Sequence, residues 1–178
     1  LGMGLPTTPS YIVVATLLVP AIIRMDVPVI AAHLFAFYFA NISGITPPVA
    51  LAAYTAASLS KADPMKTGYQ AFFLGIASYI VPFMFVFNSE LLLMGDHIGT
   101  TILAVISSGI GVAFLATAVE GFFVKNISIL QRIPLIAGAL MLIKPGWITD
   151  IIGLVLGLAV ILPLYLLGRK NKMNKQTA

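Results

Sequence analysis

The chain has 178 residues, of which 60% are hydrophobic and 9% are charged, and its mean hydropathy is +1.04. Soluble globular domains carry about 25% charged residues, so this composition excludes an ordinary soluble domain and indicates an integral membrane protein. The apolar content suffices for about five or six spanning or re-entrant segments of about 20 residues in the lipid bilayer. The formal charge of +4 does not indicate nucleic-acid binding, because the basic residues stand in loops and in a short tail.

A turn-forming segment opens the chain. Residues 2–10 combine glycine, proline and hydroxyl side chains, and residues 11–23 are apolar but too few to span a bilayer. These lengths predict a re-entrant hairpin arm over residues 1–23, in which Pro20 limits the extent of the helix. The start has neither an initiator Met nor a charged n-region, which predicts that the chain is the C-terminal portion of a longer protein. The candidate N-caps of the helix in the arm are Thr7, Thr8 and Ser10.

A polar, helix-breaking segment, Asn41-Ile-Ser-Gly-Ile-Thr-Pro-Pro48, interrupts the apolar run from Val27 to Leu59. The two prolines lack an N–H donor and Gly44 lowers helix stability, so up to about four carbonyls lose their helical partners at membrane depth. Such backbone persists where it is buried in protein or lines a cavity, and there the two helix ends can hold an anion and a cation. The alternative is a proline kink that neighbouring helices repair.

Beyond the break, the sequence predicts helices that short polar loops separate. Residues 61–66 read as a loop, and Ala71 to Leu93 is predicted to form one full span that contains Pro82. The predicted fold is therefore an all-α integral membrane bundle with a re-entrant hairpin arm and a discontinuous transmembrane helix. Further apolar segments precede the polar tail, at residues 100–123, 129–143 and 148–167.

The basic residues predict an orientation. If the tail is cytoplasmic, the alternation of spans puts eight of the ten Lys and Arg residues on the cytoplasmic side, and Arg24 and Lys144 outside. The positive-inside rule therefore favours a cytoplasmic C-terminus, with the hairpin arm entering and leaving from the outer face. The residues on the cytoplasmic side are Lys61, Lys66, Lys125, Arg132, Arg169, Lys170, Lys172 and Lys175.

Two interrupted apolar segments near each other indicate a transporter site, so a secondary active transporter is the first hypothesis. The second is a membrane channel or structural scaffold subunit, in which the breaks only shape packing. The third is an intramembrane hydrolase that uses His33 or Glu120, but no metalloprotease, nucleophile-elbow or nucleotide-binding motif is present, so no enzyme is expected. His33 is expected to be packed or interfacial, and Glu120 to reach the headgroups. The helix dipole explains the position of Asp150 near the start of the last predicted helix, where a negative charge is stabilised.

Several motifs, in this order along the chain, resemble the large permease of tripartite ATP-independent periplasmic (TRAP) transporters, and in particular the fused permease of the TAXI branch. The resemblance extends over residues 1–94, and from Asp96 onward it is weaker and similar to the extra C-terminal helices of the fused form. The motifs are Gly2-Met-Gly-Leu-Pro-Thr-Thr8 with Tyr11-Ile12, Ala32-His-Leu-Phe-Ala-Phe-Tyr-Phe39, Ile45-Thr-Pro-Pro-Val-Ala-Leu51, Ala62-Asp-Pro-Met-Lys-Thr-Gly68, Val81-Pro-Phe-Met-Phe-Val-Phe87 and Pro145-Gly-Trp-Ile-Thr-Asp150.

The resemblance implies an elevator-type transporter with inverted repeats, of which this chain is the second half. Residues 1–94 would form the second-repeat transport core, and residues 95–178 the additional C-terminal transmembrane helices with a basic cytoplasmic tail. The core would consist of the hairpin arm 1–23, a broken helix 28–60 and a helix 71–94. An extracytoplasmic solute-binding protein would deliver a carboxylate solute, and sodium or proton entry would drive uptake across a bacterial or archaeal inner membrane. Small-subunit helices, or the missing N-terminal half of the same permease, would complete it.

The resemblance also implies a site. Gly4, Pro6, Thr7 and Thr8 would belong to the tip of the second hairpin and would bind the substrate together with Asn41 and Ser43 of the broken helix. Gly44, Thr46 and Thr8 would supply carbonyl or hydroxyl oxygens to the sodium ion, and no organic cofactor is expected. Because the first repeat is missing, this chain alone is expected to hold half of the site.

Overall fold

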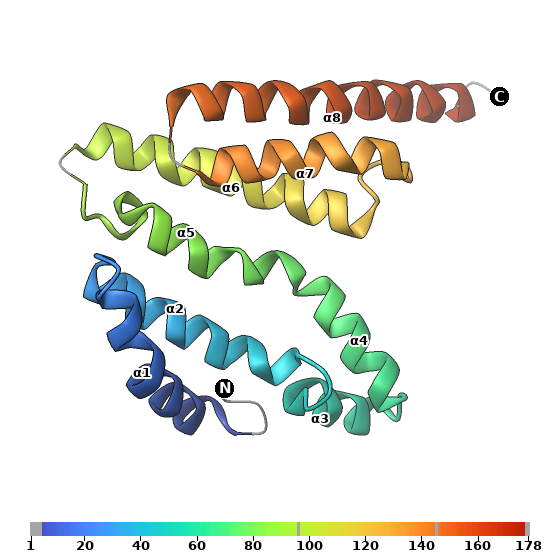
Figure 1. Ribbon diagram of the computed structural model, residues 1–178. Helices are drawn as coiled ribbons and strands as arrows, with labels where there is room; N and C mark the ends of the chain where they lie inside the picture. Colours follow the sequence, from blue (N-terminus) through green and yellow to red (C-terminus); the bar gives the residue numbers. More distant parts are fainter. Residues whose placement is uncertain (1–4, 96, 145, 177–178) are drawn as a thin grey trace. The chain divides into compact units, whose positions relative to one another are not determined.

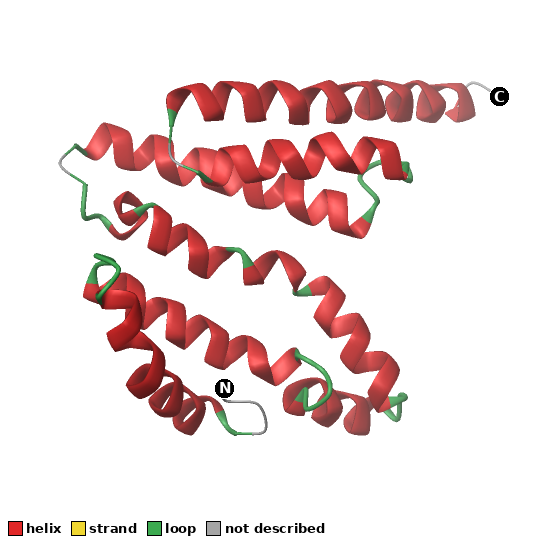
Figure 2. Ribbon diagram, viewed as in Figure 1, coloured by secondary structure: helices red, strands yellow, loops and turns green. Residues whose placement is uncertain are grey.

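The computed structural model describes residues 5–95, 97–144 and 146–176, and these residues are helical almost throughout (Figure 2). No strand occurs among them, so the predicted all-α fold is confirmed. The chain divides into two compact units, Leu1–Ile98 and Gly99–Ala178. The division lies close to the domain boundary that the sequence predicts between residues 94 and 95.

In the first unit, α1 (Thr7–Ile23) and α2 (Val29–Ile42) form an antiparallel helical hairpin, seen in blue in Figure 1. The turn between them contains Asp26 in the left-handed conformation, with φ 60°. Small alanine side chains on α2 let the two helices approach closely. The contact between the helices buries Val14, Val19, Ala32 and Ala36.

The predicted break in the second apolar segment is present. α2 ends at Ile42, a 3-10 turn η1 follows over Ser43–Ile45, and α3 extends over Leu51–Ser60. A cis peptide bond joins Pro47 to Pro48. Ala50 adopts left-handed backbone, with φ 37°, immediately before α3. Helical geometry resumes only after Ala50, so α3 begins at Leu51.

The segment Ala71 to Leu93, which the sequence predicts as one span, is not one continuous helix. The chain forms α4 (Pro64–Leu74), the 3-10 turn η2 (Ile76–Tyr79), α5 (Val81–Phe87) and the 3-10 turn η3 (Ser89–Leu92). The helix axis bends by 57° between α4 and the segment Ile76–Phe87.

A local cap explains where α4 begins, and a glycine lies where the chain bends. α4 starts before Ala71 because Asp63 caps it by accepting from the Lys66 N–H at 2.9 Å and Pro64 occupies its first turn. The bend occurs at Gly75, where a side-chain Cβ would come within 2.6 Å of Ile45 Cδ1. The chain therefore bends where α4 meets the turn η1.

The second unit contains α6 (Ile98–Glu120), α7 (Ile129–Ile143) and α8 (Trp147–Gln176). Glycines bring α7 and α8 into backbone contact, because a Cβ on Gly138 would lie 2.7 Å from the Gly153 carbonyl oxygen. Gly111 of α6 lies in the same way against the Ala139 carbonyl, where a Cβ would come to 3.0 Å. Such close approach through small residues is typical of helix packing in membranes.

Among the described residues, two helices are long and apolar enough to cross a membrane, Ile98–Glu120 and Trp147–Leu166. The bent pair of α4 with Ile76–Phe87 makes a third if it forms one span. α1, the segment Val29–Ile45 and α7 are apolar but shorter. The protein is therefore a multi-pass membrane protein, as its composition predicts.

Candidate functional site

Side chains donate to several of the carbonyl groups around the break. The carbonyl of a residue that loses its helical N–H partner needs another donor when it is away from water. Here the donors are hydroxyl and amide groups of the break itself and of α3. Asn41 Nδ2 donates to the Phe37 carbonyl at 2.9 Å, Ser43 Oγ to Ala40 at 2.7 Å, Thr46 Oγ1 to Ile42 at 2.7 Å, and the Tyr54 hydroxyl to Pro48 at 2.9 Å.

The Gly44 carbonyl cannot receive a helical hydrogen bond. Its donors in a 3-10 or an α-helix would be the N–H groups of residues 47 and 48, and both residues are prolines. Two nearby carbonyls do have backbone donors, because the Thr46 N–H donates to Ser43 at 3.3 Å and the Ala50 N–H donates to Thr46 at 3.0 Å. The break therefore leaves the Gly44 carbonyl oxygen as an acceptor without a donor from its own helix.

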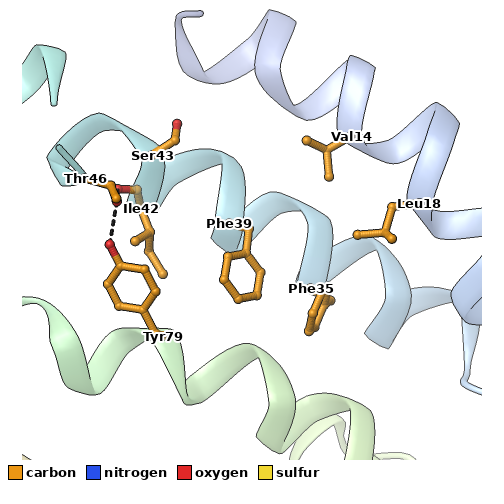
Figure 3. Close-up of a pocket in the computed structure, with 8 residues that line it drawn as sticks. All are labelled: Val14, Leu18, Phe35, Phe39, Ile42, Ser43, Thr46 and Tyr79. Atoms are coloured by element: carbon orange, nitrogen blue, oxygen red, sulfur yellow. Dashed lines mark hydrogen bonds between the residues drawn. The ribbon is translucent and has the colours of Figure 1, made fainter. Parts of the chain in front are cut away.

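Thr46 and Tyr79 meet across the first unit (Figure 3). The hydroxyl of Thr46 has one proton, and it donates this proton to the Ile42 carbonyl. The hydrogen bond between the two hydroxyls therefore runs from Tyr79 to Thr46 Oγ1. Thr46 Oγ1 keeps one lone pair that neither of these bonds uses.

A pocket of about 330 Å³ lies beside this pair. Figure 3 shows that its wall is formed by α1, by α2 with η1, and by η2, with aromatic and aliphatic side chains along most of it. The hydroxyls of Ser43, Thr46 and Tyr79 all donate their protons within the protein, so the polar groups of the pocket offer lone pairs and no donor. This chemistry suits a cation or a hydrogen-bond donor better than a carboxylate. The lining residues are Val14, Leu18, Phe35, Phe39, Ile42, Ser43, Thr46 and Tyr79.

Tyr79 is not among the site residues that the sequence predicts. Tyr79 lies 33 residues beyond Thr46, and no spacing rule connects a broken helix to a residue in the next span. The available signal was its polar hydroxyl within the apolar run Ala71 to Leu93. Its ring is held between Phe39 of α2 and Phe72 of α4, with ring centroids 6.4 and 5.5 Å away.

The predicted residues of the opening segment lie at the start of α1. Pro6 is the N-cap of this helix, and Thr7 and Thr8 are exposed in its first turn. The N-cap prediction for Thr7, Thr8 or Ser10 is wrong, because the helix starts earlier and no side chain caps it. The antiparallel hairpin puts this turn at the same end as the C-terminal end of α2, but no hydrogen bond among the described residues links the two threonines to the break. Gly4 lies outside the described residues.

The ionisable residues within the apolar segments lie in a packed position or at the ends of helices. His33 is half-buried between α1 and α2, and its Nδ1 lies 2.8 Å from the Tyr11 hydroxyl, which is a packed position. Glu120 is exposed at the end of α6, and Asp150 is in the first turn of α8. In the part of the chain that the structure describes, no group of three His, Cys, Asp or Glu residues could hold a metal ion. A cation near the break would therefore depend on carbonyl and hydroxyl oxygens.

The family is decided by a comparison with protein-family models. The model described as tripartite ATP-independent periplasmic transporter, DctM component, matches residues 1–100. The chain belongs to the DctM family. No curated protein and no solved structure matched the chain. The DctM match covers the first unit with the hairpin, the break and the bent span, whereas almost all of the second unit lies beyond it.

Membership in the DctM family makes the protein a permease component of a TRAP transporter, which is a secondary transporter. The DctM family is a family of transporter components and not of enzymes. The family also implies a periplasmic binding protein and a small membrane component as partners. The prediction of a TRAP permease is thereby confirmed.

Proposed function

We propose that this DctM chain contributes one half of a cation-coupled site in a permease that imports a carboxylate solute. The observation that carries the proposal is the Gly44 carbonyl, whose helical donors are both replaced by prolines, two residues from the hydroxyl of Thr46. An extracytoplasmic binding protein would deliver the solute at the outer face of the inner membrane. Sodium or proton entry would drive the import.

The residues at the break fit a hard monovalent cation. Hard cations prefer several oxygen ligands, and carbonyl and hydroxyl oxygens supply them without a buried negative charge. The Gly44 carbonyl and the remaining lone pair of Thr46 Oγ1 would hold the ion, and Thr8 and groups from the first repeat would complete its coordination. The cation supplies the driving force, and this chain supplies acceptor oxygens at fixed positions.

The start of α1 supports binding of the carboxylate. The first turn of a helix has N–H groups without a helical acceptor and carries a partial positive charge. Thr7 and Thr8 provide such N–H groups together with exposed hydroxyls, and the Ser10 N–H is the first to be used inside the helix, by the Pro6 carbonyl at 3.0 Å. We infer that Gly4, Pro6, Thr7 and Thr8 form the solute side of the site. Asn41, which is exposed near the end of α2, would assist them.

A channel or scaffold without transport coupling is the second candidate. It is favoured by the side-chain donors around the break, because a break that only shapes packing would also need its carbonyls satisfied. The two candidates differ in the role of the Thr46 oxygen, which is a cation ligand in the first and a helix-capping group in the second.

The experiment uses the full permease that contains this chain, reconstituted in liposomes together with its binding protein. Thr46→Ala is expected to weaken the sodium dependence of uptake by about 5- to 150-fold, which corresponds to the roughly 1 to 3 kcal/mol lost with one oxygen ligand. Thr55→Ala is the matched control, because Thr55 Oγ1 donates to the Leu51 carbonyl at 2.8 Å in the same way but lies exposed on α3. If Thr46→Ala changes the sodium dependence by less than about twofold and uptake persists without a gradient, the channel or scaffold is correct.

A further inference from the structure

The hydroxyl of Tyr79 and a cation would use the same atom of Thr46. Tyr79 donates its proton to one lone pair of Thr46 Oγ1, while Thr46 donates its own proton to the Ile42 carbonyl. A donated proton withdraws electron density from the oxygen and brings a positive partial charge beside it. A bound cation would repel that proton, so the hydrogen bond from Tyr79 weakens Thr46 as a cation ligand.

Tyr79 belongs to a part of the chain that can respond to this competition. It lies in η2, next to the 57° bend that starts after α4. The hydrogen bonds of η2 are short-range, from the Ser78 N–H to Gly75 at 2.9 Å and from the Ile80 N–H to Ala77 at 3.2 Å. Such 3-10 segments inside a helical span often mark hinges. The bond to Thr46 therefore ties a hinge in one span to the break in another.

We propose that Tyr79 is a positioning residue that competes with the coupling cation for Thr46 Oγ1 and so links cation binding to the bend at residues 75–80. This inference rests on the proposed function, because it assumes that Thr46 is a cation ligand. Cation binding displaces the Tyr79 hydroxyl from Thr46 and loosens η2 against α2. Release of the cation restores the hydrogen bond and fixes η2 again.

The test is a sodium titration of the detergent-solubilised full permease. Its readout is the melting temperature, which rises as more of the protein binds the ligand. Tyr79→Phe keeps the ring between Phe39 and Phe72 and removes the donated proton. It is expected to tighten sodium binding by about 2- to 10-fold, the equivalent of one hydrogen bond that no longer has to break. Tyr38→Phe is the matched control, because Tyr38 lies on α2 and packs against Phe85 of α5 at 5.8 Å, away from Thr46. Unchanged or weaker sodium binding in Tyr79→Phe overturns the inference.

Hydrogen exchange gives a second readout, independent of the melting temperature. Sodium is expected to increase amide exchange at Ser78 and Ile80 in the wild type but not in Tyr79→Phe, where no bond remains to be released. The double variant Thr46→Val/Tyr79→Phe should bind sodium no more tightly than Thr46→Val, because the competition needs the Thr46 oxygen. If exchange at these amides responds to sodium equally in both proteins, Tyr79 does not link the two elements.

Different results overturn the cation ligand and the role of Tyr79. If Thr46→Ala leaves sodium binding unchanged, the proposed function is wrong at this residue. If Thr46→Ala weakens sodium binding but Tyr79→Phe has the effect of Tyr38→Phe, the cation ligand stands and the role of Tyr79 is overturned.

Discussion

The hydroxyl of Tyr54 lies 2.9 Å from the carbonyl oxygen of Pro48, so the first turn of α3 closes back onto the break that precedes it. The same ring covers Gly68 of α4, where a Cβ would come within 2.7 Å of Tyr54 Cε1. Tyr54 thus holds the break, α3 and α4 together. It contacts the break at Pro48, whereas Tyr79 contacts it two residues earlier, at Thr46.

This relationship predicts the effect of removing one oxygen. Tyr54→Phe keeps the ring on Gly68 but leaves the Pro48 carbonyl without its donor, so it is expected to lower the free energy of unfolding by about 0.5 to 1.5 kcal/mol, the net contribution of one hydrogen bond. The measurement is unfolding in detergent monitored by circular dichroism. Tyr69→Phe is the control, since Tyr69 is 52% exposed on α4, and it should be neutral. Equal effects of the two variants would show that the Pro48 carbonyl does not need Tyr54.

The proposed role of the Gly44 carbonyl predicts tolerance at this position. A Cβ on Gly44 would lie 3.8 Å from Ala52 Cβ, an ordinary contact, and the carbonyl would remain in place. Gly44→Ala should therefore keep sodium affinity within about threefold, well short of the loss expected for Thr46→Ala. Sodium titration of the full permease measures both. A large loss of sodium affinity in Gly44→Ala would indicate that the site requires residue 44 to have no side chain, and not only its carbonyl.

The break could be predicted from sequence because its causes are local. Pro47 and Pro48 lack N–H groups whatever surrounds them, and this alone stops a helix. The partners of the break could not be predicted in the same way, since Tyr79 and Tyr54 reach it through tertiary packing. Ser43 shows a further limit, because its proton is used by the Ala40 carbonyl. Residue type identified Ser43 as polar, but only geometry shows that its proton is already donated and that its lone pairs are what it can offer a ligand.

The bent span illustrates how a signal can be present and still be misread. Asp63 followed by Pro64 is a helix-start pattern, yet the charged and turn-forming residues that cluster around them predict a loop. Pro82 was expected inside a helix, whereas it occupies the first turn of α5, where its missing N–H costs nothing. The bend lies at Gly75, which packs against Ile45 of η1, and no local pattern encodes this tertiary contact.

The distribution of basic residues predicts which loops face outward. The chain has no cysteine, so single cysteines can be introduced and labelled without background. Met25, 75% exposed in the turn between α1 and α2, and Ala62, exposed after α3, are suitable positions. A membrane-impermeant maleimide added from outside should label Met25→Cys and should label Ala62→Cys only after the membrane is permeabilised. The opposite pattern would place the C-terminus outside.

The packing of the second unit predicts which glycines are essential. A Cβ on Gly153 would lie 2.7 Å from the Gly138 carbonyl oxygen, and this neighbour is backbone that cannot rotate away. Gly153→Ala must therefore push α8 away from α7, and it is expected to lower the free energy of unfolding by about 1 to 3 kcal/mol. Gly109→Ala on α6 is the matched control, because nothing lies within 4 Å of its Cβ position. There the same substitution should be neutral or stabilising by up to about 1 kcal/mol, since alanine favours a helix. Thermal unfolding of both variants measures the difference, and equal stabilities would contradict the close contact between α7 and α8.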